Sequence, residues 1–145
     1  MGNIRTEGCI LLAFDGSAHS MKALDEAMRI AKALNVKLLV LHVYWGEAAD
    51  VNSDPKRIAI EDVDLEAQMM FGKLEKILKE NGVEYELRSE LNADVPFAIT
   101  EIADKENSEM IIIGNRGVGS IRDFLLGSVA EKVTSISKRS VLIVK

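Results

Sequence analysis

The sequence predicts an α/β fold in which one domain, residues 1–145, is built on an open five-stranded parallel sheet with helices on both faces. Two observations carry this prediction. Short apolar runs alternate along the chain with stretches of helical periodicity, a pattern typical of a parallel sheet that is covered on both sides. The length of 145 residues fits one domain, and a content of 48% hydrophobic and 28% charged residues is ordinary for a globular chain.

The first third of the chain predicts two buried strands around a helix. Residues 9–14 form a continuous apolar run and are interpreted as a central strand. Ser17 then serves as a helix N-cap, and the apolar period of that helix ends near Asn35. Residues 36–44 predict the second buried strand, in which His42 is interpreted as a core histidine satisfied by hydrogen bonding.

The middle of the chain predicts a loop and a second helix. Residues 45–60 show no clear period and include Pro55, so they are interpreted as a long loop. A helix is predicted at about 61–80, and Asn81-Gly82 ends it. The residues predicted to face inward from this helix are Met69, Met70, Leu74, Ile77 and Leu78.

The last part of the chain predicts two further strand and helix pairs. Residues 83–88 alternate between apolar and polar, which indicates a half-exposed strand near a sheet edge. Pro96 suits the first turn of a helix at about 95–106. Residues 110–113 are a buried strand that leads directly into Gly114. The inward residues of the third helix are predicted to be Phe97, Ile99, Ile102 and Ala103.

A final helix at about 128–138 and a closing strand complete a Rossmann-like sheet of order 3-2-1-4-5, with right-handed connections. Val141–Val144, the closing strand, is apolar and lies at a sheet edge. Unpaired N–H and C=O groups on an apolar edge invite pairing with another chain. We therefore expect a homodimer in which this strand pairs antiparallel with its own copy across a two-fold axis.

Composition narrows the possible partners. Cys9 is the single cysteine, so no intrachain disulfide can form. A formal net charge of -5 argues against nucleic acid or an anionic membrane surface as the main partner, because both require a basic surface. No apolar run approaches the roughly 20 residues that cross a bilayer, and no signal peptide is recognisable. A cytoplasmic location is the expectation.

A glycine-rich segment at the end of the fourth predicted strand is the main candidate site. Gly114 and Gly117 are followed, after nine residues, by Gly127 and Ser128. Parallel sheets bind ligands outside the carboxyl ends of their strands. Glycines allow backbone N–H groups to approach a phosphate, because no Cβ intervenes. Ser128 and Glu131 have the spacing of a capping box, and a helix N-terminus there would bind an anion.

Two common phosphate motifs do not match this segment. In the P-loop pattern starting at Gly114, Ser120 stands where lysine is required. In the dinucleotide pattern, Arg116 stands where glycine is required. A glycine-rich turn that merely joins a strand to a helix stays open as the alternative.

The spacing Gly-x2-Gly-x9-Gly-Ser resembles the ATP-binding signature of the universal stress protein family. The resemblance extends from the strand followed by Asp-Gly-Ser at residues 15–17, through Leu41-His42-Val43, to the terminal Val-Leu-Ile-Val-Lys. It implies an ATP-binding, nucleotide-responsive regulator of the stress response with at most slow hydrolysis. It also implies the dimer through the closing strand. Mg²⁺ would be held mainly through the phosphates and water.

The resemblance also implies individual contacts. Asp15 would contact the ribose or the adenine side, and Val43 would contact adenine through its backbone. Ala13 and Ile113 would form apolar walls. Arg116 occupies the variable position between the first two glycines, and the sequence itself makes it the nearest mobile cation to the phosphates. The residues implied to contact the nucleotide are Ala13, Asp15, Val43, Ile113, Gly114, Arg116, Gly117, Gly127, Ser128 and Val129.

One alternative from another class stays open: a true ATPase or an adenylyl-transferring enzyme on the same fold. The sequence contains no recognisable set of nucleophile, base and orienting residue. His19, early in the first helix, is interpreted as exposed, with a position over the phosphate end as the alternative. Trp45 either packs within the predicted loop or covers the adenine side of the site as a lid.

Overall fold

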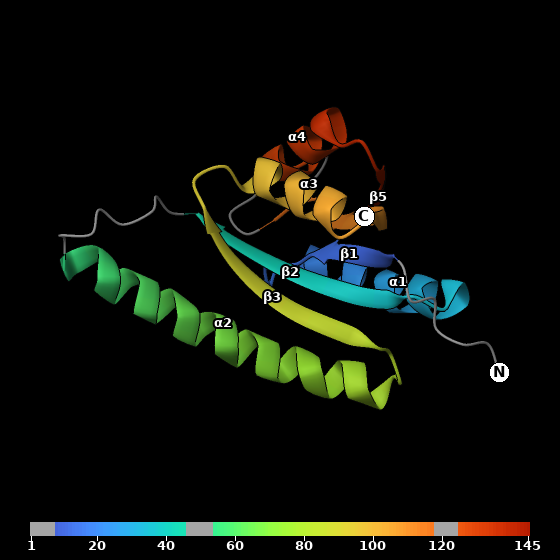
Figure 1. The fold of residues 1–145 in the computed structure, drawn as a ribbon, viewed down its shortest axis with the longest axis horizontal. Helices are drawn as coiled ribbons and strands as arrows, with labels where there is room; N and C mark the ends of the chain where they lie inside the picture. The colour runs from blue at the N-terminus through green and yellow to red at the C-terminus, as the bar shows by residue number, and fades with distance from the viewer. Residues whose placement is uncertain (1–7, 46–53, 118–124) are drawn as a thin grey trace.

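The computed structural model describes residues 8–45, 54–117 and 125–145 (Figure 1). In these residues five parallel strands form one sheet of order β3-β2-β1-β4-β5, as the sequence predicts. The strands are β1 (Cys9–Ala13), β2 (Lys37–Trp45), β3 (Tyr85–Asn92), β4 (Ser108–Gly114) and β5 (Ser140–Val144). The helices are α1 (Ala18–Leu34), α2 (Asp54–Glu80), α3 (Val95–Lys105) and α4 (Ser128–Ile136).

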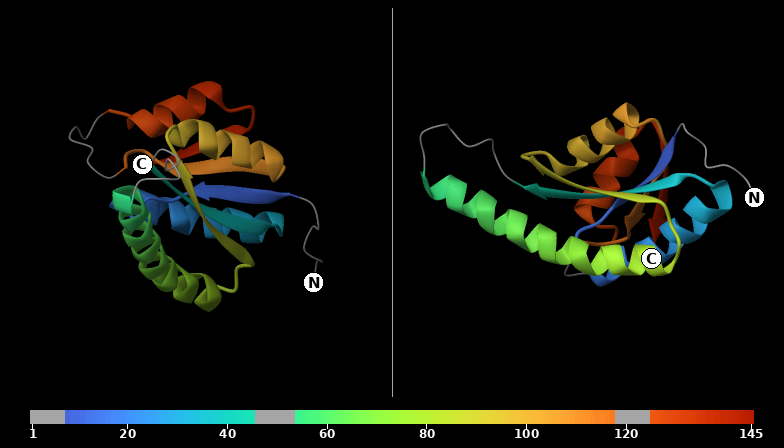
Figure 2. Two further views of the ribbon diagram at one scale, coloured as in Figure 1. Left: turned by 60° about the vertical axis from the view of Figure 1, so that its left-hand side comes forward. Right: turned by 60° about the horizontal axis from the view of Figure 1, so that its bottom comes forward.

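The helices cover both faces of the sheet, α1 and α2 on one side and α3 and α4 on the other (Figure 2). Leu12 and Val40 pack toward α1 and α2, whereas Leu11 and Leu39 pack toward α3 and α4. Every residue of β1 is buried, because β2 and β4 flank it and helices cover both of its faces. This explains why its sequence is continuously apolar and does not alternate.

Helix caps fix where the chain turns from strand to helix. Ser17 caps α1, and its side chain accepts a hydrogen bond of 3.1 Å from the backbone N–H of Ser20. Asn35 ends α1 in the left-handed conformation, with φ 56°. Asp94 caps α3 by accepting from the N–H of Phe97 at 3.1 Å. The predicted cap of α1 and its predicted end near Asn35 are thus confirmed.

Helix α2 begins earlier than the sequence analysis predicts. It starts at Asp54, so residues 54–60, interpreted as loop, are helical. Pro55 supports the loop interpretation in the sequence analysis. In the first turn of a helix, however, proline loses no hydrogen bond and its fixed φ is already helical. Trp45, also interpreted as loop, is the last residue of β2 and pairs with Asn92. Residues 46–53, the rest of the predicted loop, lie outside the described residues.

Two residues predicted to face inward are instead exposed. Met69 is 64% exposed, because the buried face of α2 runs through Ala67, Leu74 and Leu78, and Met69 is off that face. Phe97 is 52% exposed, because α3 buries Ala98, Ile99, Ile102 and Ala103. A helical period identifies a face only to within about one residue when neighbouring positions are both apolar.

The two edge strands differ in character. All eight residues of β3 are half-buried, as predicted for an edge strand, and it pairs with β2 from Tyr85 to Asn92. The strand begins two residues later and ends four residues later than the predicted 83–88, and Val83 is buried before it begins. At the other edge, β5 pairs with β4 in the described residues. Among the helices described, none combines the length and apolarity required to cross a bilayer.

Candidate functional site

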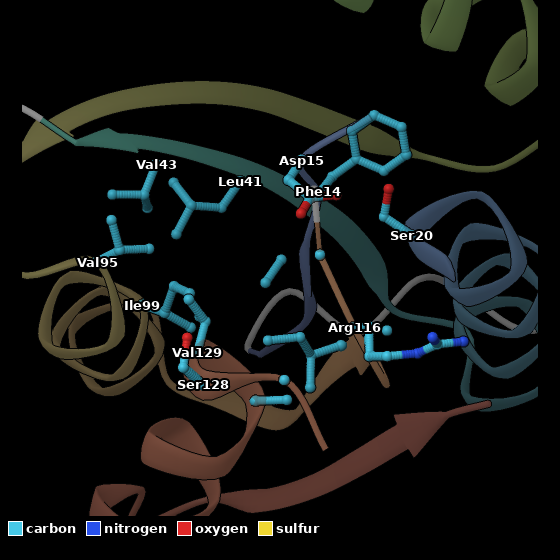
Figure 3. Close-up of a pocket in the computed structure, with 16 residues that line it drawn as sticks. Phe14, Asp15, Ser20, Leu41, Val43, Val95, Ile99, Arg116, Ser128 and Val129 are labelled. Carbon is cyan, nitrogen blue, oxygen red and sulfur yellow. The ribbon is translucent and has the colours of Figure 1, made fainter. Parts of the chain in front are cut away.

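A cavity of about 400 Å³ opens where β1, β2 and β4 end and α3 and α4 begin (Figure 3). Its volume is within the range of small-ligand sites. Its position, outside the carboxyl ends of the strands and beside the central strand β1, is where open parallel sheets bind ligands. Parallel pairing places all of these strand ends on the same side of the sheet.

All ten residues named from the sequence line this one cavity. They include two segments about one hundred residues apart, residues 13–15 and 113–117, which β1–β4 pairing brings together. That they contact a nucleotide stays a prediction. The lining residues that the sequence analysis missed are Phe14, Ser20, Leu41, Val95, Ile99 and Ala130. Leu41 could have been found from Val43, because residues two apart on a strand share a face.

One side of the cavity is apolar. Leu41 and Val43 project from β2, and Val95 and Ile99 face them from α3 (Figure 3). Asp15 lies between this apolar side and the glycine-rich loop. A flat apolar ring would be desolvated on such a wall, while a polar group of the same ligand could reach the carboxylate.

The amino end of α4 forms another part of the lining. Gly127 is its N-cap and Ser128 its first residue, and glycine has no side chain with which to cap the helix. The predicted capping box between Ser128 and Glu131 is therefore wrong: Ser128 lies one residue too far along to cap. The first N–H groups of a helix have no partner within the helix, and in α4 they belong to residues that line the cavity.

The three glycines of the loop allow the chain to pack closely on itself. A Cβ on Gly114 would lie 2.8 Å from the backbone carbon of His19, in the first turn of α1. On Gly117 it would lie 2.4 Å from Asp15 Oδ2, and on Gly127 it would lie 3.1 Å from Arg116 Cα. The sequence predicts that a Cβ on these glycines would occupy the space that a phosphate oxygen requires. In the structure, the space beside each glycine is taken by protein atoms.

The polar residues of the site are held by one another. Asp15 Oδ1 accepts a hydrogen bond of 2.9 Å from the backbone N–H of Ser17. Arg116 extends toward α1 (Figure 3), where its Nη2 lies 2.8 Å from His19 Nε2. His19 is half-buried, so the interpretation of this residue as an exposed one is wrong. The guanidinium predicted to be a mobile cation is bonded to α1.

His42 has the structural role predicted for it. Its Nδ1 lies 2.9 Å from the carbonyl oxygen of Phe14, and because a carbonyl can only accept, Nδ1 donates. Its ring stacks on Tyr44 and meets Phe71 edge-on. The described residues contain no cluster of three His, Cys, Asp or Glu side chains able to hold a metal ion.

The comparisons with known proteins identify the family. The family model described as the universal stress protein family matches residues 9–145. The chain belongs to the universal stress protein family. Universal stress protein YxiE of Bacillus subtilis is 32% identical over 145 residues, which cover 94% of this chain and 97% of that protein.

Solved universal stress proteins share the fold. UspA from Lactobacillus plantarum superposes with a TM-score of 0.81 over 95% of this chain and 97% of its own, at 19% identity. A universal stress protein crystallised in complex with cAMP is 29% identical, with a TM-score of 0.70, and the match covers 95% of this chain and 96% of that one.

Proposed function

We propose that this universal stress protein binds ATP in the cavity at the ends of β1, β2 and β4 and acts as a nucleotide-responsive regulator of the stress response. The observation that carries the proposal is the composition of the lining. One cavity combines an apolar wall, a carboxylate and the amino end of a helix whose N-cap is glycine. These three features match the base, the ribose hydroxyls and the phosphates of a nucleotide.

The proposed orientation places adenine against Val43, with Ala13 and Ile113 as the neighbouring walls. Asp15 accepts hydrogen bonds from the ribose or from the adenine edge. Ser128 and Val129 donate backbone N–H groups to the phosphates, whereas the N–H of Gly127, implied as a further donor, is bonded to the carbonyl oxygen of Asn115. The relative that was solved with cAMP supports an adenine nucleotide as the ligand class. Mg²⁺ would be held mainly by phosphate oxygens and water, because Mg²⁺ usually keeps several waters and binds through substrate phosphates.

The proposed activity is binding, with at most slow hydrolysis. Within the described part of the lining, the ionisable side chains are Asp15 and Arg116, and Arg116 is bonded to His19. A true ATPase or adenylyl-transferring enzyme requires a group that activates a nucleophile at the phosphates. If the protein is a binder, ATP mixed with stoichiometric protein and Mg²⁺ persists for many minutes. Turnover at about 1 per second or faster would favour the enzyme.

The test of ligand identity is direct. The protein is purified without added nucleotide, denatured, and its small molecules are analysed by chromatography and ultraviolet absorbance. Calorimetric titration then compares ATP, cAMP and GTP. Val43→Phe, which fills the adenine end, should abolish ATP binding and leave thermal unfolding unchanged. Binding of ATP by this variant with the affinity of the parent would contradict the proposed orientation, and absence of ATP binding by the parent would contradict the function.

We also propose a cytoplasmic homodimer joined through β5. The closing strand has one bonded neighbour, β4, among the described residues, and Leu142 is exposed at 36%. An apolar strand with an open edge favours pairing with a second copy. Light scattering should report twice the chain mass of 16.0 kDa. Leu142→Pro should weaken the dimer, because proline cannot donate to a strand ladder. A parent protein that stays monomeric at high micromolar concentration would contradict the dimer.

A further inference from the structure

His19 does not line the cavity, yet it contacts the loop that does. Its Nε2 lies 2.8 Å from Nη2 of Arg116. A guanidinium carries only donors, so in this contact Nε2 is the acceptor. His19 is thus the acceptor that holds the one basic side chain among the described lining residues.

The backbone on both sides of this contact is also packed. Gly114 lies so close to His19 that a Cβ would be 2.8 Å from its backbone carbon. Ser17 Oγ donates to the carbonyl oxygen of Arg116 at 3.5 Å. A Cβ on Gly127 would be 3.1 Å from Arg116 Cα. Arg116 is therefore held at its side chain by His19 and at its backbone by Ser17 and Gly127.

The residue before Arg116 connects this contact to the amino end of α4. The carbonyl oxygen of Asn115 accepts a hydrogen bond of 2.8 Å from the N–H of Gly127, the N-cap of α4. The N–H of Asn115 donates to Val144 of β5 at 2.7 Å. Asn115 therefore links Arg116 to the helix end that faces the cavity.

We infer that His19 is a positioning residue for the cavity: by accepting a hydrogen bond from Arg116 it fixes the Gly114–Gly117 loop and, through Asn115 and Gly127, the amino end of α4. Its effect on ATP affinity rests on the proposed function. Its effect on the loop does not, because the contacts that transmit it exist without ligand.

Three variants separate the acceptor from the bulk of the ring. His19→Gln keeps an acceptor at the position of Nε2. His19→Leu keeps similar volume and removes the acceptor, and Arg116→Met removes the donor without touching α1. Gly72→Ala is the unrelated control, because a Cβ there has nothing within 4 Å.

The first measurement is the exchange rate of the Gly127 amide proton in the unliganded protein, followed by nuclear magnetic resonance. Losing a hydrogen bond to a charged group should speed exchange roughly tenfold in His19→Leu and Arg116→Met. His19→Gln and Gly72→Ala should match the parent. The double variant His19→Leu/Arg116→Met should be no faster than either single variant, because both remove the same contact.

The second measurement is ATP affinity by calorimetry on the same variants. The expected loss is again roughly tenfold in His19→Leu and Arg116→Met, with His19→Gln like the parent. Parental exchange at Gly127 in His19→Leu and in Arg116→Met would overturn the inference. Exchange at Gly127 that is as fast in His19→Gln as in His19→Leu would also overturn the inference, because the hydrogen-bond acceptor would then have no effect. If the parent itself binds no ATP, the proposed function fails, and the exchange rates still decide the role of His19.

Discussion

Replacing Gly114 with alanine would place a methyl group against the backbone of α1. The added Cβ would lie 2.8, 2.9 and 3.0 Å from the carbonyl carbon, Cβ and carbonyl oxygen of His19. These distances are 0.4–0.6 Å short of the 3.4 Å at which ordinary contact begins. Two of the three atoms are backbone, so no side-chain rotation relieves the overlap, and β4 and α1 must move apart.

The expected cost follows from overpacking in a close-packed interior, typically about 1–3 kcal/mol. For a domain of this size, about 2 kcal/mol corresponds to a fall in Tm of roughly 4–8 °C. Gly72→Ala provides the matched control, because it adds the same methyl group at an exposed position of α2. Alanine is favoured over glycine in a helix by about 1 kcal/mol, so that variant should be more stable than the parent.

Urea unfolding monitored by circular dichroism, together with thermal scans, measures both variants against the parent. The reasoning requires opposite signs for the same chemical change. A Gly114→Ala variant that unfolds at the parental midpoint, while Gly72→Ala is stabilised as expected, would refute the close approach of α1 to β4.

Three further predictions concern the site, pH and the cysteine. Gly117→Ala should displace the carboxylate of Asp15, whose Oδ2 would be 2.4 Å from the new Cβ, and weaken ATP binding roughly tenfold, as measured by calorimetry. Partial burial alone would raise the pKa of Glu86, but hydrogen bonds from Arg88 and Lys37, together with their charges, outweigh it and lower the pKa below its ordinary value of 4.5. A group whose pKa is lowered by folding stabilises the fold at pH values above its ordinary pKa. The difference in unfolding free energy between the parent and Glu86→Gln should therefore shrink as the pH falls below 4.5. A difference that is constant with pH would contradict the ion pairs. Cys9 is 2% exposed, and burial raises the pKa of its thiol. Alkylation of Cys9 in the folded protein should therefore be at least about tenfold slower than in urea. Equal rates would contradict the burial of β1.

The strand order and the location of the site could be predicted from sequence because buried strands, glycines and caps carry strong local signals. Continuous apolar runs such as residues 9–14 identify strands that are covered on both faces. The exit of β4 into Gly114 places the loop at the correct end of the sheet. The family resemblance then gave ten residues that line a single cavity.

Other features depend on tertiary contacts that no local pattern encodes. The pairing of Arg116 with His19 joins residues 97 positions apart in the chain. The glycines could be recognised from the sequence as sites of close approach. The atoms that approach them could not be predicted, because α1 and Asp15 reach the loop only through the packing of β1 beside β4. The exposure of Met69 depends on which side of α2 meets the sheet, and two adjacent methionines left that choice open.

The central position of β1 has a consequence for how the chain is made. Cys9–Ala13 is synthesised before the other four strands, but one of its two neighbours, β4, is completed about a hundred residues later. At synthesis rates of about 5–20 residues per second, one edge of the most apolar strand waits on the order of ten seconds for its partner. During that interval β1 and β2 can pair, leaving the far edge of β1 open to other chains. A variant that slows the docking of β4 would therefore reduce yield through aggregation during synthesis, even if the finished protein were fully stable.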